Sequence, residues 1–206
     1  MYKKLKEQIT ETTQYYLLRN VHPRAEQPFQ VRDDEEMQEL VESIRMNGVL
    51  NPLIVTPRRG GGYEIVSGHR RYAACQKLGV ETIPVIVREL DPDEATLCMI
   101  DSNLHREHLL PSEKAYAYKA KMEVLNRQGQ RYGQTSSQPA TKWDAATEIG
   151  KAINESRDQV FRYIRLTNLI KPLMDIVDSG RIAFTPAVEL SYLPHELQDK
   201  IVEIFE

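Results

Sequence analysis

The apolar positions of residues 33–47 recur at the spacing of an amphipathic helix. They are Met37, Leu40, Val41 and Ile44, which share one helical face. Asp33 is a suitable N-cap for this helix, and Asn47-Gly48 is a typical helix stop. The pattern therefore predicts one helix here, with its apolar face toward a core.

After this helix, the apolar and polar positions follow the pattern of β-strands. Residues 53–56 form a short apolar run, residues 63–67 alternate apolar and polar side chains, and the glycine-rich stretch 57–62 lies between them. This order predicts a β-hairpin. After Gly68 the apolar spacing becomes helical, and residues 83–87 then form another strand with the composition of a buried one.

The pattern beyond residue 90 is helical. A mostly apolar helix is expected after Pro92, and a long helix over residues 112–128. Residues 129–142 are rich in Gly, Gln, Ser and Thr, which predicts a flexible loop. An amphipathic helix near the end of the chain, suited to packing on its own domain or on a partner, is marked by Leu197, Ile201, Ile204 and Phe205.

Residues 145–166 fit the pattern of a helix-turn-helix. Gly150 falls ten residues before the apolar Val160, where two crossing helices need a small side chain. Asn154 falls at the turn position that needs a left-handed backbone, and Ser156 is a suitable N-cap for the second helix. A pair of packed helices with a solvated outer face is the plainer alternative.

Together these elements predict an α+β N-terminal domain with a small mixed sheet, followed by an all-α domain that carries the helix-turn-helix. We place the first domain at residues 21–110 and the second at residues 111–206. Residues 1–20 are polar and aromatic without a clear period, so we expect them to form a loosely packed arm.

Composition restricts the function classes. The chain has 206 residues, 41% hydrophobic and 28% charged, which is ordinary for a globular protein. No apolar run approaches about 18 residues and no signal-peptide pattern is present, so we expect a cytoplasmic protein with no membrane partner. Cys75 and Cys98 have no His or Cys at ligand spacing beside them, which argues against a zinc site and a disulfide framework.

The net charge of −3 conceals an uneven distribution. Residues 118–165 carry nine Lys and Arg against five Asp and Glu, a local charge of +4. This segment contains the predicted helix-turn-helix. Such a local excess of cations favours contact with nucleic acid.

The strand-to-helix junction at Gly68 has the features of an anion-binding site. Free N–H groups and the helix dipole favour negative charge there, and glycine lets a ligand approach the backbone. Arg70 and Arg71 follow in the first helical turn and add donors suited to phosphate. Downstream, Asn103 is a candidate metal ligand and Arg106 a candidate charge for the same phosphates, although taken alone this stretch is better interpreted as a helix C-terminus with ordinary exposed polar residues. On composition alone, solvated surface arginines are an equally good interpretation.

The start of the second helix of a helix-turn-helix is where side chains reach the major groove. The expected DNA-binding residues are Lys151, Ser156, Arg157, Gln159, Arg162 and Arg165. Among them we expect Arg157, Gln159 and Arg162 to read bases, and Lys151 and Arg165 to contact mainly phosphates.

These blocks, in this order, resemble the ParB family of DNA-partition proteins over about residues 21–193. The similar blocks are Pro28-Phe29-Gln30-Val31-Arg32, Asn47-Gly48-Val49-Leu50-Asn51-Pro52-Leu53, Gly68-His69-Arg70-Arg71, Ile83-Pro84-Val85, Asn103-Leu104-His105-Arg106-Glu107 and the helix-turn-helix. The resemblance implies a ParB/sulfiredoxin-like domain that binds CTP. It also implies a protein that loads at a palindromic site and slides along DNA as a closed dimer.

The resemblance further implies roles for single residues. Those implied for the nucleotide are Gly48, Asn51 and Pro52 at the cytosine, Gly68, His69, Arg70 and Arg71 at the triphosphate, and Asn103 and Arg106 at magnesium and the phosphates. The implied partners are double-stranded DNA, a second copy of the chain when DNA or CTP is bound, and a ParA-type ATPase. The implied place of action is the nucleoid or a plasmid, in segregation of a chromosome, plasmid or mobile element.

Two positions depart from the family. His69 and Ser102 stand where members often carry Glu, so two carboxylates are missing near the expected metal. We therefore expect slow CTP hydrolysis or none, with His69 as the remaining candidate for a catalytic base. The family's C-terminal dimerisation domain has no counterpart before Glu206, so we expect this chain to be a monomer when free.

Two other enzyme classes share parts of the pattern. Sulfiredoxin needs a catalytic cysteine in its phosphate motif, but Gly68 holds that position here, which excludes the reaction. A ParB-like nuclease needs a metal cluster, for which the candidates are His69, Asp101, His105, Glu107 and His108. A nuclease and a DNA-binding transcriptional regulator both remain alternatives to a partition protein.

Overall fold

A computed structural model describes residues 12–25, 27–104, 106, 108–133 and 144–205 of the chain. The chain divides into two compact units, Met1–Met99 and Ile100–Glu206. The division falls within α3 (Pro92–Asn103), and the domain bounds at residues 21–110 and 111–206 stay a prediction. In the described part of the chain, no helix is both long and apolar enough to cross a membrane.

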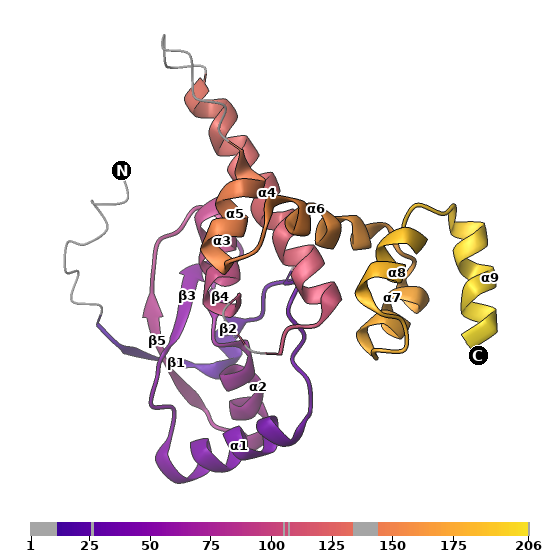
Figure 1. Cartoon of the computed structure of the whole chain (residues 1–206). Coiled ribbons are helices and arrows are strands. Elements are labelled where there is room, and N and C mark those ends of the chain that lie inside the picture. The colour runs from indigo at the N-terminus through magenta and orange to yellow at the C-terminus, as the bar shows by residue number, and fades with distance from the viewer. Residues whose placement is uncertain (1–11, 26, 105, 107, 134–143, 206) are drawn as a thin grey trace. The chain divides into compact units, whose positions relative to one another are not determined.

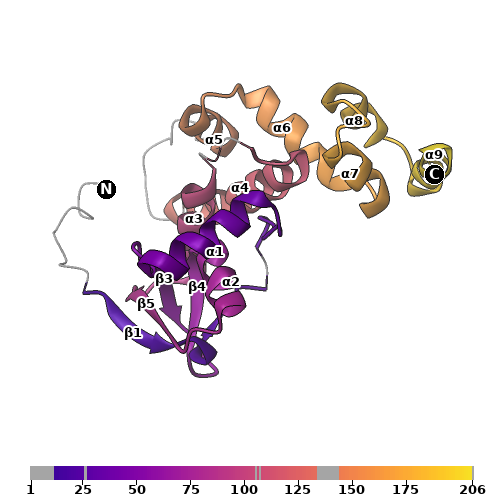
Figure 2. The same ribbon diagram turned by 90° about the horizontal axis from the view of Figure 1, so that it is seen from below.

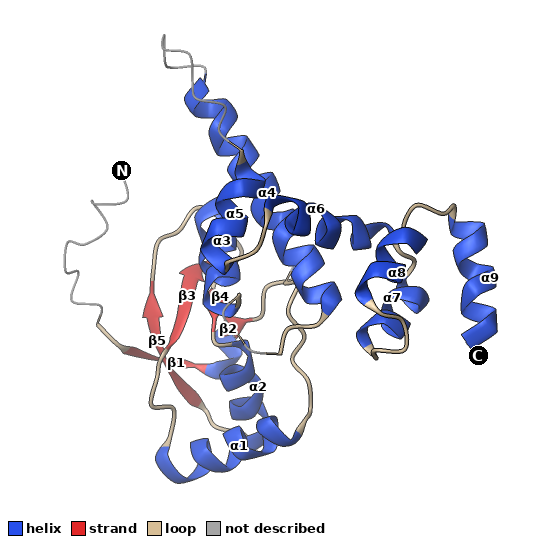
Figure 3. Cartoon of the chain, in the orientation of Figure 1, coloured by secondary structure: helices blue, strands red, loops and turns tan. Residues whose placement is uncertain are grey.

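The first unit is built on a five-stranded mixed sheet (Figures 1 and 3). The strands are β1 (Gln14–Leu17), β2 (Val21–His22), β3 (Leu53–Pro57), β4 (Tyr63–Ser67) and β5 (Thr82–Val87), in the order β1-β5-β3-β4-β2. β3 and β4 form the predicted antiparallel hairpin. β5 lies parallel to β3, because β4 returns the chain to the end of the sheet where β3 begins, and α2 (His69–Leu78) then connects β4 to β5.

Residues 14–20 are not the loosely packed arm that we expected. β1 pairs antiparallel with β5, from Gln14 opposite Val85 to Leu17 opposite Thr82, and a short 3-10 turn, η2 (Leu18–Asn20), follows. A four-residue strand is too short to show a period, and its pairing partner is distant in the sequence. Residues 1–11 of the predicted arm lie outside the described residues.

Two helices of the first unit, α1 (Glu35–Asn47) and α2, pack against each other (Figure 2). The N-cap of α1 is Asp34 rather than the predicted Asp33, because the Asp34 Oδ1 accepts a hydrogen bond from the Met37 N–H at 2.9 Å. The helix ends at Gly48 as predicted. The core between the helices and the sheet includes Met37, Ile44, Leu53, Val55, Ile65, Cys75, Ile83 and Val85.

The described part of the second unit is helical. After the end of α3 come α4 (Pro111–Gly133), α5 (Ala145–Ile153), α6 (Arg157–Arg165), η3 (Leu166–Asn168), α7 (Lys171–Asp178), α8 (Phe184–Leu190) and α9 (His195–Phe205). α4 packs on both α5 and α6. Gln198 of α9 is fully buried and bonds to the backbone of Asn168, Ile170 and Leu193, so α9 packs on its own domain.

Helix α4 is longer than predicted. We expected it to end at Gln128, but residues 129–133 continue the helix. Gly129 in a helix interior costs about 1 kcal/mol relative to Ala, and the Gln and Arg residues beside it are good helix formers. The remaining residues of the predicted loop, 134–142, lie outside the described residues.

Candidate nucleotide and nucleic-acid sites

The backbone at Gly68 can be formed only by glycine. β4 ends at Ser67, α2 begins at His69, and Gly68 between them has a φ of 107°. A Cβ at this position would lie 2.8 Å from the Leu53 Cγ and 3.1 Å from the Arg71 Nη2. Because Gly68 has no side chain with which to cap α2, the first N–H groups of the helix are left for another acceptor.

Arg70 binds the start of the neighbouring helix. Its Nη2 lies 2.8 Å from the Asp34 Oδ1 and its Nη1 lies 3.3 Å from the Oδ2, while Glu36 is 3.4 Å away. The hydrogen bond from Arg70 holds the pKa of Asp34 below its ordinary value. The charge of this predicted phosphate ligand is thus already compensated by carboxylates of α1.

Arg71 binds the loop that follows α1. Its Nη1 donates to the carbonyl oxygen of Pro52 at 2.9 Å and also to that of Asn51. Burial lowers the pKa of Arg71 from its ordinary value. The structure therefore brings Gly68 and Arg71 together with Asn51 and Pro52, which the resemblance assigns to the cytosine.

His69 is neutral at pH 7. Burial, and secondly the positive charge of Arg24, lower the pKa of His69 to about 4. Its Nε2 is buried and has no hydrogen-bond partner among the described residues. An unsatisfied polar atom beside Gly68 is what a bound polar ligand would satisfy, so these residues fit a phosphate-bearing nucleotide. A base with this pKa is weak, however, which fits the expected slow hydrolysis.

Asn103 is the last residue of α3 rather than part of a loop, and its Nδ2 donates to the Ser102 Oγ at 3.3 Å. The Arg106 N–H donates to the Asn103 carbonyl oxygen at 3.0 Å. Both residues belong to the second unit, so their part in the nucleotide site stays a prediction. Among the described residues, no three His, Cys, Asp or Glu side chains form a metal-binding group; the nuclease candidates His105 and Glu107 lie outside them.

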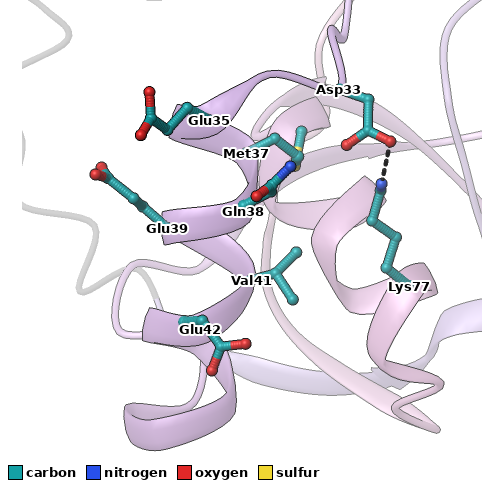
Figure 4. Close-up of a pocket in the computed structure, with 8 residues that line it drawn as sticks. All are labelled: Asp33, Glu35, Met37, Gln38, Glu39, Val41, Glu42 and Lys77. Atoms are coloured by element: carbon teal, nitrogen blue, oxygen red, sulfur yellow. Dashed lines mark hydrogen bonds and ion pairs between the residues drawn. The ribbon is translucent and has the colours of Figure 1, made fainter.

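A hollow of about 720 Å³ lies beside α1 and is acidic (Figure 4). Its charged lining residues are Asp33, Glu35, Glu39, Glu42 and Lys77. Lys77 lies 2.7 Å from the Asp33 Oδ2, so the hollow keeps uncompensated negative charge. It suits an anion poorly, and none of the predicted nucleotide ligands lines it.

The turn between α5 and α6 has the predicted geometry. Asn154 is left-handed, with a φ of 57°, and the Ser156 Oγ accepts a hydrogen bond from the Gln159 N–H at 3.1 Å. A Cβ on Gly150 would lie 2.5 Å from the Glu155 carbonyl oxygen, so the small side chain is needed for the turn itself rather than for a crossing helix. Val160 is fully buried, as expected.

The three arginines of α6 have different partners. Arg157 pairs with Asp144, the N-cap of α5, and the hydrogen bond from Arg157 lowers the pKa of Asp144. Arg162 and Arg165 instead bond to residues near the C-terminal end of the sequence. The Arg162 Nη2 donates to the Thr185 Oγ1 at 2.9 Å, and the Arg165 Nη2 to the Ser191 carbonyl oxygen at 3.1 Å.

The structure does not place the predicted base-reading residues on one free face. Arg157 is exposed, but Gln159 is half-buried and Arg162 also lies over the ring of Phe184, at 5.0 Å from its centroid. The predicted phosphate contact Lys151 and the cap Ser156 are exposed. Phe161, which was not among the predicted site residues, is 41% exposed; its place next to the buried Val160 is the signal that it faces outward.

Comparison with known proteins identifies the family. The model of the ParB N-terminal domain matches residues 2–104. The probable chromosome 1-partitioning protein ParB of Deinococcus radiodurans is 37% identical over 164 residues, which cover 79% of this chain and 50% of that protein. The chromosome-partitioning protein Spo0J of Thermus thermophilus is 33% identical over 179 residues, which cover 87% of this chain and 60% of that protein.

A solved structure is similar along almost the whole chain. It is the C-terminally truncated chromosome-partitioning protein ParB of Caulobacter crescentus, complexed to the centromeric parS site. It has 25% sequence identity and a TM-score of 0.56, covering 94% of this chain and 93% of that one. The chain spans about half to three-fifths of the length of the two curated relatives. It belongs to the ParB family, which it matches through the ParB N-terminal domain.

Proposed function

We propose that this chain is a DNA-binding partition protein that binds CTP in its first unit and a palindromic DNA site through α5 and α6 in its second. The observation that carries the proposal is the turn at Asn154. Together with Gly150 and Ser156, this turn presents the start of α6 to solvent. The turn lies within residues 118–165, which carry a net charge of +4. The partition proteins that are similar to this chain, one of them solved with its parS site, support the same role.

In the DNA-binding unit, Arg157 and Gln159 at the start of α6 are the proposed base-reading residues, with Arg162. Arg157 must leave Asp144, and Arg162 must leave Thr185, to reach a base edge. Lys151 and Arg165 contact phosphates, which position the helix without reading sequence. Two copies of the chain on a palindrome present two such helices to two half-sites.

In the nucleotide-binding unit, Gly68, His69, Arg70 and Arg71 hold the triphosphate, and Gly48, Asn51 and Pro52 frame the cytosine. Membership of the ParB family supports CTP, and the free N–H groups after Gly68 support a triphosphate. Asn103 and Arg106 hold magnesium and phosphate oxygens. Magnesium would supply charge neutralisation of the triphosphate when it is bound.

Hydrolysis of CTP is slow or absent in this proposal. The pKa of His69, about 4, makes it a poor proton acceptor, and no carboxylate stands at position 69 or 102 to replace it. The protein acts at the nucleoid or on a plasmid, with a ParA-type ATPase as a partner. The replicon is a chromosome, a plasmid or a mobile element.

Calorimetry and phosphate release test the nucleotide half of the proposal. The full chain should bind CTP in preference to ATP, GTP and UTP when magnesium is present, and phosphate release with DNA should stay near background. Equal affinity for all four nucleotides, or none for any, would refute CTP as the ligand. Nicking of a supercoiled plasmid with magnesium or manganese would instead favour the nuclease alternative.

A further inference from the structure

A second hollow, of about 390 Å³, lies at the C-terminal half of α6. Phe161, Arg162 and Arg165 of α6 line it, together with Lys119 of α4 and Tyr192 from the loop after α8. All of these residues belong to the second unit. The hollow therefore combines α6 with two segments outside the helix-turn-helix.

The charge of this hollow is positive and uncompensated. Its lining includes Lys119, Arg162 and Arg165 but no Asp or Glu. Within the described part of the chain, none of the three cations forms an ion pair, and the two arginines use neutral acceptors, the Thr185 Oγ1 and the Ser191 carbonyl oxygen. The hollow beside α1, in contrast, is acidic. The positive hollow at α6 therefore attracts an anion.

The rings in the hollow suit a sugar more than a bare ion. Tyr192 is 63% exposed, and the Arg165 guanidinium lies 4.0 Å from the centroid of its ring. Of the α6 residues that line the hollow, Arg165 lies at one end and the exposed Phe161 at the other. The Arg165 Nε is buried without a hydrogen-bond partner among the described residues, while the Nη2 bond to the Ser191 carbonyl oxygen and packing against Tyr192 hold this arginine in place. A cation beside an exposed ring can contact a phosphate and the adjoining deoxyribose together.

The position of the hollow on α6 indicates which phosphates it meets. From Arg157 to Arg165 the helix rises roughly 12 Å, at 1.5 Å per residue. The major groove of B-DNA is about 8.5 Å deep, so a helix of this length that touches bases with its start and is inclined out of the groove brings its far end to the level of the phosphates. The hollow lies at that far end of α6.

We propose that this hollow binds the sugar–phosphate backbone that borders the groove entered by α6, with Lys119 and Arg165 on neighbouring phosphates and Tyr192 against the sugar. The inference rests on the proposed DNA-binding function and adds Lys119 and Tyr192 as contacts outside the helix-turn-helix. Because the contact is to backbone, it strengthens binding to every sequence alike.

The test measures the affinity of the full chain for a random-sequence duplex over a series of salt concentrations. Each phosphate contact contributes about 0.9 to the slope of log affinity against log salt. Lys119→Ala should therefore reduce the slope by about one unit. Tyr192→Ala should weaken binding severalfold without changing the slope, and Tyr192→Phe should keep the wild-type affinity.

Lys171→Ala is the matched control, because Lys171 is an exposed lysine of the same unit that pairs with Asp175 at the start of α7. It should leave the slope unchanged. If Lys119→Ala behaves as Lys171→Ala does while the wild-type chain binds the duplex, the hollow is not a DNA contact, and the proposed function is untouched. If the wild-type chain does not bind the random-sequence duplex, the hollow proposal is refuted, whereas the proposed DNA-binding function is refuted only if the chain also recovers no fragment of genomic or plasmid DNA.

Discussion

The two units place an arginine at the start of a helix in the same local setting. Arg70, in the first turn of α2, pairs with Asp34, the N-cap of α1. Arg157, at the start of α6, pairs with Asp144, the N-cap of α5. Each aspartate thus caps one helix and holds an arginine at the start of the next.

The units differ in what surrounds this pair. In the first unit, Glu36 also approaches Arg70, and backbone carbonyls hold the half-buried Arg71. In the second unit, Arg162 and Arg165 bind neutral acceptors and lie over the rings of Phe184 and Tyr192. The first arrangement suits one compact anion that must displace internal partners, and the second suits an extended polyanion.

The largest expected effect is that of Arg71→Ala on nucleotide binding. It removes a charge next to Gly68 and also frees the Asn51–Pro52 loop. CTP affinity should fall at least about 100-fold, or roughly 2.7 kcal/mol, as measured by calorimetry. Arg58→Ala, in the exposed hairpin turn, is the matched control and should bind as the wild type does.

Glycine replacement probes the local geometry of both units. Gly68→Ala forces a side chain into a left-handed backbone against Leu53, and Gly150→Ala sets a Cβ 2.5 Å from a carbonyl oxygen. Each should lower the free energy of unfolding by about 2–3 kcal/mol in denaturant titrations. Gly60→Ala meets no atom within 4 Å and should change little. Equal stability of all three variants would contradict the close contacts.

The pH dependence of stability tests the burial of His69. Its pKa is about 4 in the folded chain and near 6.5 when unfolded. The unfolded chain therefore binds more protons between these values, so stability is full above pH 6.5 and falls as the pH drops toward 4. The loss is on the order of 3 kcal/mol.

Urea titrations at several pH values would measure that loss. His69→Gln should flatten the profile in this window, whereas His195→Gln, at the exposed start of α9, should leave it unchanged. A wild-type profile that is already flat between pH 4 and 6.5 would show that His69 is not buried as described.

The smallest expected effects are those of replacing Asp34 or Asp144 on ligand affinity, and each replacement should affect a different ligand. Asn is also a good N-cap, so Asp34→Asn and Asp144→Asn should retain both helices. Asp34→Asn releases Arg70 and should raise CTP affinity severalfold in calorimetry, with no change in DNA binding. Asp144→Asn releases Arg157 and should raise DNA affinity severalfold, with no change in CTP binding. An effect of either variant on the other ligand would contradict the separation of the sites.

The two aspartates also contribute to acid stability. Their pKa values are lowered in the folded chain by their arginine partners. Their stabilisation is therefore present above the ordinary value of 3.8 and is lost as the pH falls through the lowered folded values. Either Asn variant should weaken that acid-side dependence in the same urea titrations.

Local backbone geometry could be predicted from the sequence, but tertiary partners could not. The left-handed Asn154, the glycine at position 68 and the cap at Ser156 depend on residues within a few positions. The pairing of β1 with β5 and the bond between Arg162 and Thr185 join residues far apart in the sequence. A periodic pattern does not encode such contacts, so the strand β1 and the internal partners of the arginines were missed.

The most direct test of the proposed function is recovery of DNA by the full chain. Fragmented genomic and plasmid DNA would be incubated with the chain, with and without CTP, and the retained fragments sequenced. We predict enrichment of one discrete palindrome, bound far more weakly as a half-site than as a whole. Uniform retention of all fragments, or retention of none, would contradict the account of this chain as a sequence-specific partition protein.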